Sequence, residues 1–242
     1  MKKIKTYLLS LLISFTYLGC NKDKNDTLEE TLLNKDLHYG EVSDLDGNIY
    51  ATIKIGNQNW MAENLRTSHY ANGDLIPNVP ESNEWINLTS GAWVHYENNP
   101  ELNALHGKLY NWHAIQNAKG ICPKGWHVPS NEEWNTLLNY LGGKEIAGGK
   151  LKSKLLNAWA FHFNGQSTES EPNNESGFSS VASGSRSVDG MFGLMSFRAT
   201  YWSSNEYSAS DAYTREIFWN GDAAGSFNEY KKNGYSCRCV QN

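Results

Sequence analysis

A helix near the middle of the chain is the clearest element that the pattern of apolar and polar positions predicts. Ser130 and Glu133 stand three residues apart at its start, as in a capping box, where the hydroxyl accepts a helix N–H and the carboxylate reaches back. The apolar side chains that recur on one face are Trp134, Leu137, Leu138 and Leu141. Because two glycines follow at once, we expect a capped helix that ends near residue 141.

Alternating positions predict two hairpins at the start of the folded part. Residues 42–55 form two short runs around Asp46-Gly47-Asn48, which is a favourable hairpin turn sequence. A second turn directly after them would bring Trp60 and Met61 to the core.

The spacing of Asp44, Asp46 and Asn48 also suggests the first ligands of a calcium loop. An EF-hand loop needs a glutamate at its twelfth position and a helix after it, whereas residues 53–55 are typical of a strand. The sequence therefore favours the hairpin turn.

The rest of the chain is less regular. Residues 110–115 fit a strand and a helix equally well, and residues 144–156 show near-helical spacing interrupted by two glycines. Residues 157–200 are rich in Gly, Ser and Asn, which predicts irregular loops. Closing strands are expected at residues 201–202, 217–219 and 235–240.

The segment from residue 66 to residue 105 is long, polar and interrupted by prolines, and loops of this length commonly carry function. Trp85, Trp93 and Tyr96 lie in it. Rings of this kind stack on sugars, which makes them candidate ligand-binding residues. The interpretation that the rings instead anchor the loop to the domain is favoured, because most aromatic side chains are structural anchors.

The N-terminus is typical of an exported protein. A basic start precedes an apolar run of about a dozen residues, which is too short to span a bilayer and matches a secretory signal. Gly19 directly before Cys20 resembles a bacterial lipoprotein signal, so we expect residues 1–19 to be removed and Cys20 to be lipidated, which attaches the protein to a membrane. Ordinary cleavage without lipidation is the alternative.

The segment after this cysteine is polar and predicts a flexible tether over residues 20–38. The folded domain is then expected over residues 39–242.

Composition and charge narrow the choice of partners. The chain of 242 residues has 9 Trp and 13 Tyr, so we expect an aromatic core whose indole and phenol groups need hydrogen-bond partners. The net charge is -5, with no basic run after the first residues, which argues against nucleic acid as a partner.

Several motifs occur in the order found in one known family. The segment from Cys122 to Trp134, Cys-Pro-x-Gly-Trp-His-x-Pro-Ser-x-x-Glu-Trp, resembles the signature of the Fibrobacter succinogenes major paralogous domain. Further matching stretches lie at residues 46–50, 55–65, 107–112, 147–152, 174–179, 201–204 and 236–240. The resemblance covers roughly residues 41–242.

This resemblance implies a surface lipoprotein of the outer membrane, with a periplasm-facing position as the alternative. It also implies an α+β, C-type-lectin-like fold of short strands and hairpins, two helices and long irregular loops. Formylglycine-generating enzymes share that fold.

The cysteines left after lipidation are Cys122, Cys237 and Cys239. Cys239 stands where the family usually has its terminal cysteine, so the resemblance implies a Cys122–Cys239 disulfide, which export permits. Cys237 shares a strand face with Cys239 and is the alternative partner. Three zinc thiolates are a further alternative, although no histidine has metal-ligand spacing.

An enzyme is not expected, and we assign no catalytic residues. The sequence has no G-x-S-x-G, no H-E-x-x-H and no Walker glycine loop. Formylglycine-generating enzymes work through a reactive cysteine pair, whereas a structural bridge explains the cysteines here. His127 has no assignable nucleophile, and we interpret it as a hydrogen-bonded structural residue.

A calcium-dependent lectin is the main alternative function. Glu171-Pro172-Asn173 matches the sugar-and-calcium tripeptide of mannose-type lectins, and Trp219-Asn220-Gly221-Asp222 resembles their Trp-Asn-Asp. Glu171, Asn173 and Asp222 would be the ligands, although Gly221 interrupts the second motif.

The favoured interpretation is a non-catalytic, cell-surface module for adhesion or recognition. It needs no cofactor and binds a glycan or a protein through loops on a rigid scaffold.

Overall fold

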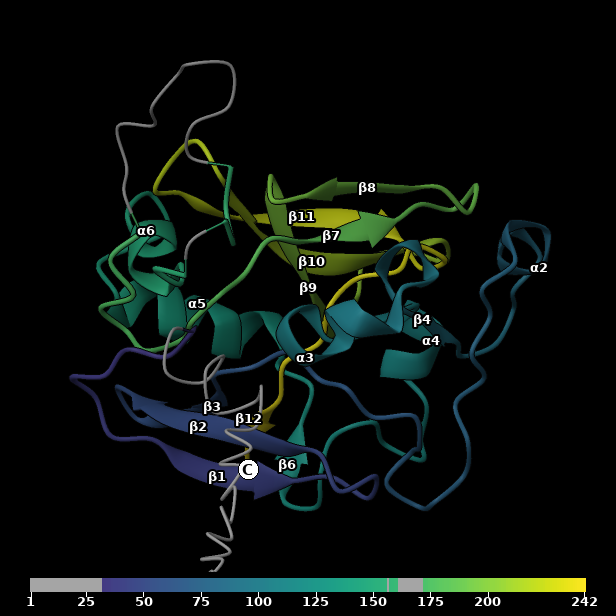
Figure 1. Cartoon of the computed structure of the whole chain (residues 1–242), viewed down its shortest axis with the longest axis horizontal. Helices are drawn as coiled ribbons and strands as arrows, with labels where there is room; N and C mark the ends of the chain where they lie inside the picture. Colours follow the sequence, from purple (N-terminus) through teal and green to yellow (C-terminus); the bar gives the residue numbers. More distant parts are fainter. Residues whose placement is uncertain (1–31, 156, 161–171) are drawn as a thin grey trace, which may run out of the picture.

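The turn at residues 46–48 joins two antiparallel strands in the computed structural model of the chain (Figure 1). A second tight turn leads into the third strand, which carries the fully buried Trp60 and Met61. Both predicted hairpins are confirmed. The order of the five-stranded sheet is β1 (Gly40–Ser43), β2 (Ile49–Ile55), β3 (Gln58–Met61), β12 (Val240–Gln241) and β6 (Trp126–His127).

The structure describes residues 32–155, 157–160 and 172–242. The expectations for the signal peptide, for Cys20 and for Glu171 fall outside these residues. In the described part of the chain, no helix has the length and apolar character needed to cross a membrane.

The packed domain begins earlier than expected. Leu32 is only 6 % exposed, and its carbonyl accepts a hydrogen bond of 3.0 Å from Ser153 Oγ. Asn34 Nδ2 donates to the carbonyl of Asn174 over 2.9 Å. These contacts place residues from 32 on in the domain, so the predicted boundary near Tyr39 is wrong by at least seven residues.

A second sheet covers the other side of the domain. It has the order β11 (Ala224–Tyr230), β10 (Asp211–Phe218) and β9 (Arg198–Glu206). Two smaller pairs complete the strands: β4 (Trp93–Val94) with β5 (Leu109–Tyr110), and β7 (Ser183–Arg186) with β8 (Phe192–Met195). The β7–β8 hairpin and the start of β9 correct the expectation of loops throughout residues 157–200.

The longest described helix is α5 (Asn131–Tyr140), and both bonds of the predicted capping box are present. Residues 110–115 combine the two predicted states, because the end of β5 is followed directly by the helix α4. The other helical segments are single turns: α2 (Ser82–Ile86), η1 (Tyr96–Asn98), η2 (Pro100–Leu102), α3 (Asn103–His106), α4 (Trp112–Ile115) and α6 (Ala147–Leu151).

The core between the layers is aromatic, as predicted. Figure 1 shows α5 between the five-stranded sheet and the β9–β11 sheet. Trp134 of this helix lies 4.7 Å from Trp60 of β3 and 5.7 Å from Tyr201 of β9, measured between ring centroids. Phe178 closes the cluster against the same rings. The predicted α+β class is confirmed.

Arg238 lies inside this core with 1 % of its surface exposed. Its guanidinium donates to the carbonyls of Phe178 and Ser179 and, over 2.9 Å, to Asn64 Oδ1. It also sits 4.2 Å from the centroid of the Phe178 ring. One cation thereby joins the C-terminal segment, the loop before β7 and the end of β3.

Candidate functional site

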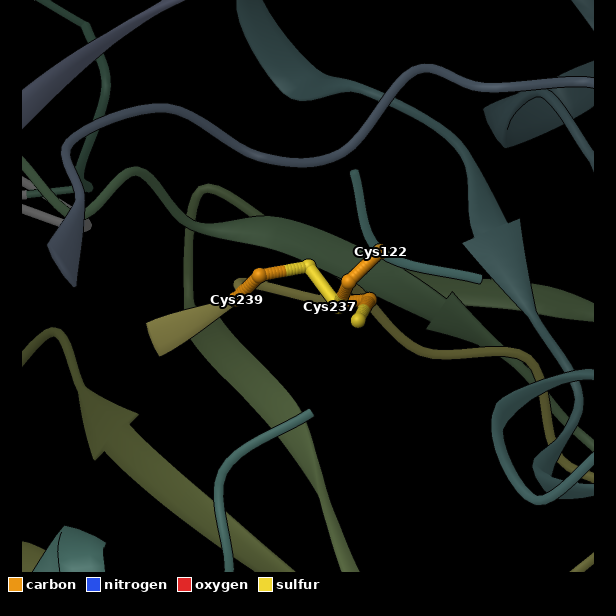
Figure 2. Close-up of side chains that lie close together, drawn as sticks. All are labelled: Cys122, Cys237 and Cys239. Atoms are coloured by element: carbon orange, nitrogen blue, oxygen red, sulfur yellow. A yellow bond between two sulfur atoms is a disulfide. The ribbon is translucent and has the colours of Figure 1, made fainter. Parts of the chain in front are cut away.

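Three sulfur atoms meet where the C-terminal segment crosses the domain (Figure 2). Cys122 and Cys239 form the predicted disulfide across a sequence separation of 117 residues. Cys237 keeps a free, fully buried thiol, and the three sulfurs lie within 4.8 Å of one another. Burial raises the pKa of the Cys237 thiol, so this group stays protonated. With two sulfurs bonded together, this set does not offer the three thiolates of a zinc site.

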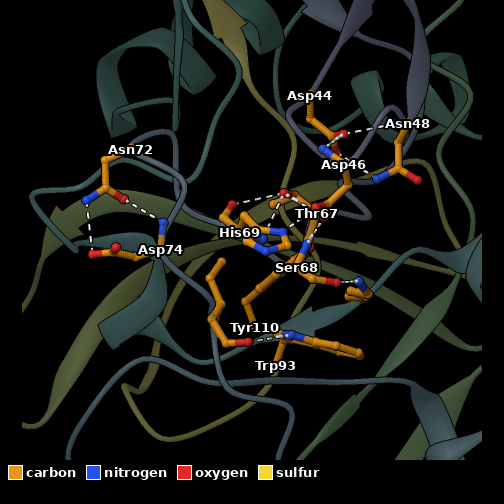
Figure 3. A network of polar contacts seen from close by, with 12 residues as sticks. Asp44, Asp46, Asn48, Thr67, Ser68, His69, Asn72, Asp74, Trp93 and Tyr110 are labelled. Carbon is orange, nitrogen blue, oxygen red and sulfur yellow. Dashed lines mark hydrogen bonds and ion pairs between the residues drawn. The ribbon is translucent and has the colours of Figure 1, made fainter.

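The carboxylates of the first turn are fully engaged by protein donors (Figure 3). Asp44 accepts hydrogen bonds from the backbone N–H groups of Asp46 and Asn48 and from the Tyr50 hydroxyl. Asp46 accepts from the Ser68 N–H and pairs with His69 Nδ1. The turn therefore holds the loop after β3 in place, which agrees with the hairpin interpretation. The carboxylates of Asp44 and Asp46 already have protein partners.

Lys108 also contacts the loop after β3. Its buried ammonium donates to Ser68 Oγ and lies 3.9 Å from the centroid of the Trp93 ring. Burial lowers the pKa of Lys108 to about 8, and the negative charges of Asp46 and Asp44 oppose that shift. Trp93 is thus a structural support, and its Nε1 donates to the carbonyl of Ile76 over 2.9 Å.

The three candidate aromatic residues are buried: the exposed fraction is 0 % for Trp85 and 8 % for both Trp93 and Tyr96. The guanidinium of Arg186 lies 4.6 Å from the Trp85 ring, and Phe192 lies 5.4 Å from the Tyr96 ring. The prediction that these rings stack on a surface sugar is wrong. The alternative that they anchor the loop agrees with the structure.

Two members of the calcium set, Asn173 and Asp222, lie against the short helix α6. The Asn173 N–H donates to the carbonyl of Gly149, and the Gly148 N–H donates to the carbonyl of Asp222. The ammonium of Lys152 interacts with the charge of Asp222. Burial lowers the pKa of Lys152 to about 8, and the negative charge of Asp222 opposes that shift. A lysine therefore balances the charge of Asp222. The described residues of this set give no support to a calcium site.

A cavity of about 520 Å³ lies between the first hairpin and the η2–α3 segment. Its main charged groups already satisfy one another, since Arg66 Nη1 pairs with Glu63 Oε1 at 2.7 Å and Arg66 Nη2 donates to the carbonyl of Ile49. The Ala51 N–H donates to the other oxygen of Glu63. These groups brace the hairpin.

A groove of about 370 Å³ offers a more accessible surface. Five separate segments line it: residues 88–89, His113 of α4, Val188 between β7 and β8, residues 209–210 between β9 and β10, and residues 230–232. Tyr230 ends β11 and is 56 % exposed. Leu88, Val188 and Ala209 make the lining largely apolar around this ring.

Three basic side chains lie along the same groove. Lys231 is buried over the Trp112 ring at 4.8 Å, and its ammonium pairs with Glu206. Lys232 donates to the carbonyl of Ile86 over 2.9 Å and makes no ion pair with any described residue. The pKa of His113 is lowered by burial and by both lysines, which favours its neutral form.

Sequence reasoning missed this groove because no local motif marks it. Tyr230, Lys231 and Lys232 are adjacent in the chain, but the apolar walls come from segments up to about 140 residues away. The run Tyr-Lys-Lys in an acidic chain was the one available signal.

The chain belongs to the Fibrobacter succinogenes major domain family, whose model matches residues 53–241. This match confirms the family that the sequence motifs indicated. No curated protein and no solved structure matches the chain. The match establishes the family and names no activity.

Proposed function

We propose that the protein is a non-catalytic recognition module, attached to the outer membrane through lipidated Cys20, that binds an acidic glycan in the Tyr230 groove. The observation that carries this proposal is the exposed Tyr230 ring beside Lys232 in a groove built from five loops and element ends. Exported adhesion proteins use such loops for recognition when a rigid scaffold holds them.

The ring and the apolar lining fit the C–H face of a sugar. An exposed tyrosine offers a flat apolar surface together with a hydroxyl that can bond a sugar hydroxyl. Leu88, Val188 and Ala209 extend that surface, while Ser210 and Thr89 add polar groups that could orient a ligand.

The charge of the groove favours an acidic ligand. Glu206 already neutralises Lys231, whereas the Lys232 ammonium donates to a backbone carbonyl and pairs with no carboxylate of the described residues. A carboxylate or sulfate on the sugar would supply the missing counter-charge through a charge-assisted hydrogen bond. The positive charge of Lys232 is opposite in sign to the net charge of -5 of the whole chain.

The scaffold behind the groove is held by several long-range links. The Cys122–Cys239 disulfide and the buried Arg238 fasten the C-terminal segment that continues from Lys232. A fixed groove binds with less loss of loop entropy than a flexible one.

A glycan array probed with the wild-type protein, Tyr230→Ala and Tyr140→Ala tests the proposal. Tyr140 is 66 % exposed on α5 and does not line the groove, so it is a matched control. We expect acidic glycans to bind the wild type and the control, and Tyr230→Ala to lose this binding. If both variants bound glycans as the wild type does, the groove would be excluded as the glycan-binding site. An array without any binding would favour a protein partner.

A further inference from the structure

The strand β11 lies at the edge of its sheet, with β10 on one side and no strand of the described residues on the other. Its central residues Ser226, Phe227 and Asn228 are all exposed. Such an edge carries backbone N–H and C=O groups that can pair with another strand, and proteins usually block it with a lysine, a proline or a bulge. The strand β11 reads Ala-Gly-Ser-Phe-Asn-Glu-Tyr, pairs with β10 in an unbroken register and has none of these features.

The direction of the backbone groups along β11 follows from the bond at its start. Ala224 lies opposite Ile217 of β10, but its N–H donates over 2.7 Å to the carbonyl of Lys144, so its backbone points away from β10. Because this direction alternates along an antiparallel strand, the N–H and C=O groups of Ser226 and Asn228 also point away from β10. Among the described residues, these groups have no hydrogen-bond partner.

The free groups are symmetric about Phe227, which makes the edge complementary to a second copy of itself. A two-fold axis at Phe227 places Ser226 of one chain opposite Asn228 of the other, where the two residues exchange both of their backbone hydrogen bonds. The axis repeats this pair on its other side. The Ala224 N–H and the Tyr230 C=O already have partners in their own chain, which centres the pairing on residues 225–229.

The side chain of Phe227 lies at the centre of this register. Phe227 is 42 % exposed, and its ring packs against Phe218 of β10 with centroids 5.9 Å apart. In the two-fold register it lies directly opposite Phe227 of the second copy at a non-hydrogen-bonded position, where opposite side chains approach most closely. Aromatic pairs across two strands stabilise a sheet, so this contact covers the exposed ring favourably.

The charge of β11 also fits a second copy. Glu229 is the one charged residue of the strand, and the register about Phe227 places it opposite Gly225 of the second copy. Moving the axis to Glu229 would instead bring two carboxylates together, which destabilises a strand pair. The charge therefore favours the same axis as the free backbone groups.

We propose that β11 pairs with β11 of a second copy of the chain about a two-fold axis at Phe227, which joins the two sheets into one. Because Tyr230 then lies opposite Ala224 of the second copy, the two Tyr230 residues are about 20 Å apart along the strands. A dimer presents two grooves and can hold a polymeric glycan at both. This consequence rests on the proposed function, whereas the dimer itself does not.

Sedimentation velocity of the purified full-length protein over a concentration series tests the proposal without any ligand. We expect the mass of two chains at high concentration and of one chain on dilution. Phe227→Lys and Phe227→Glu should each weaken the dimer by about tenfold or more, because either change removes the aromatic pair and puts like charges directly opposite each other. The two variants should bind each other more tightly than either binds itself, since opposite charges then face each other.

Ser226→Pro tests the backbone pairing. Proline removes the N–H that points away from β10 and leaves the bonds between β10 and β11 in place, so we expect a monomer. Tyr140→Lys, at an exposed ring on α5, is the matched control for Phe227→Lys and should dimerise as the wild type does.

Three results would overturn the proposal. The first is a wild-type protein that stays monomeric at every concentration. The second is a dimer that Phe227→Lys and Ser226→Pro leave unchanged. The third is a mass that keeps growing beyond two chains, because a closed two-fold pair cannot extend.

Discussion

Thr200 lies directly opposite Glu216 across the β9–β10 pair, and neither side chain reaches solvent. A hydroxyl and a carboxylate in such a pair are stable only when further groups satisfy them. Arg198 Nη1 pairs with Glu216 Oε2 at 3.1 Å, and the carboxyl group of Glu216 is hydrogen-bonded to that of Glu229, so the two carboxyl groups share a proton.

The protein should lose stability as the pH rises. Burial raises the pKa of Glu216 from an ordinary 4.5 to about 7, Arg198 opposes the rise and Glu229 adds to it. The folded state then keeps a proton that the unfolded state releases between these values. The stability is full below pH 4.5 and falls by at most about 3 kcal/mol as the pH passes 7.

Urea unfolding of the wild type and of Glu216→Gln at a series of pH values measures this effect. Glu216→Gln should remove the decline. A stability that changes in the same way between pH 5 and pH 8 in both proteins would contradict the assignment to Glu216.

The disulfide should be the largest single covalent contribution to stability. Removing a cross-link that closes a loop of 117 residues is expected to cost about 4–5 kcal/mol by the chain-entropy model. Cys122→Ser should lose this amount in urea unfolding. Cys239→Ser should lose less, because the Cys237 sulfur lies within 4.8 Å and can form the bridge with Cys122 instead.

Mass spectrometry after thiol alkylation distinguishes these forms. A Cys122–Cys237 bond in Cys239→Ser would show that Cys237 can replace Cys239 as the disulfide partner of Cys122. Equal losses in both variants, with all thiols alkylated, would show that the sulfurs cannot exchange roles.

Replacing Arg238 should lower the stability of the folded protein strongly. Arg238→Met keeps much of the side-chain volume but leaves Asn64 Oδ1 and two carbonyls buried without a donor. Several such losses together should lower the free energy of unfolding by about 3 kcal/mol or more. Lys54→Met on the exposed side of β2 is the surface control, and a similar small loss in both would contradict the role of Arg238.

The elements that were predicted correctly are those whose causes are local in sequence. Ser130 and Glu133 cap α5 within a single turn, and Gly47 sets the first hairpin turn within five residues. The disulfide followed from the family resemblance. Each of these features is fixed by neighbours in the chain or by a motif.

The features that were missed depend on distant partners. The strand β7 reads Ser-Gly-Ser-Arg, which has little strand propensity, and its Arg186 is held by the carbonyls of Val79 and Pro80, more than a hundred residues away. The same arginine buries Trp85, which the sequence alone left as a candidate sugar platform. The groove likewise requires five segments that only the fold brings together.

Calorimetric titration with a matched pair of oligosaccharides tests the proposal that Lys232 and Tyr230 recognise an acidic sugar. The pair consists of an acidic oligosaccharide that binds the array and the same compound with its carboxyl groups reduced to alcohols. A charge-assisted hydrogen bond of about 1.5–3 kcal/mol predicts that the acidic form binds about 10- to 150-fold more tightly, and that Lys232→Glu abolishes the difference. Equal affinity of both compounds for the wild-type protein would contradict the claim.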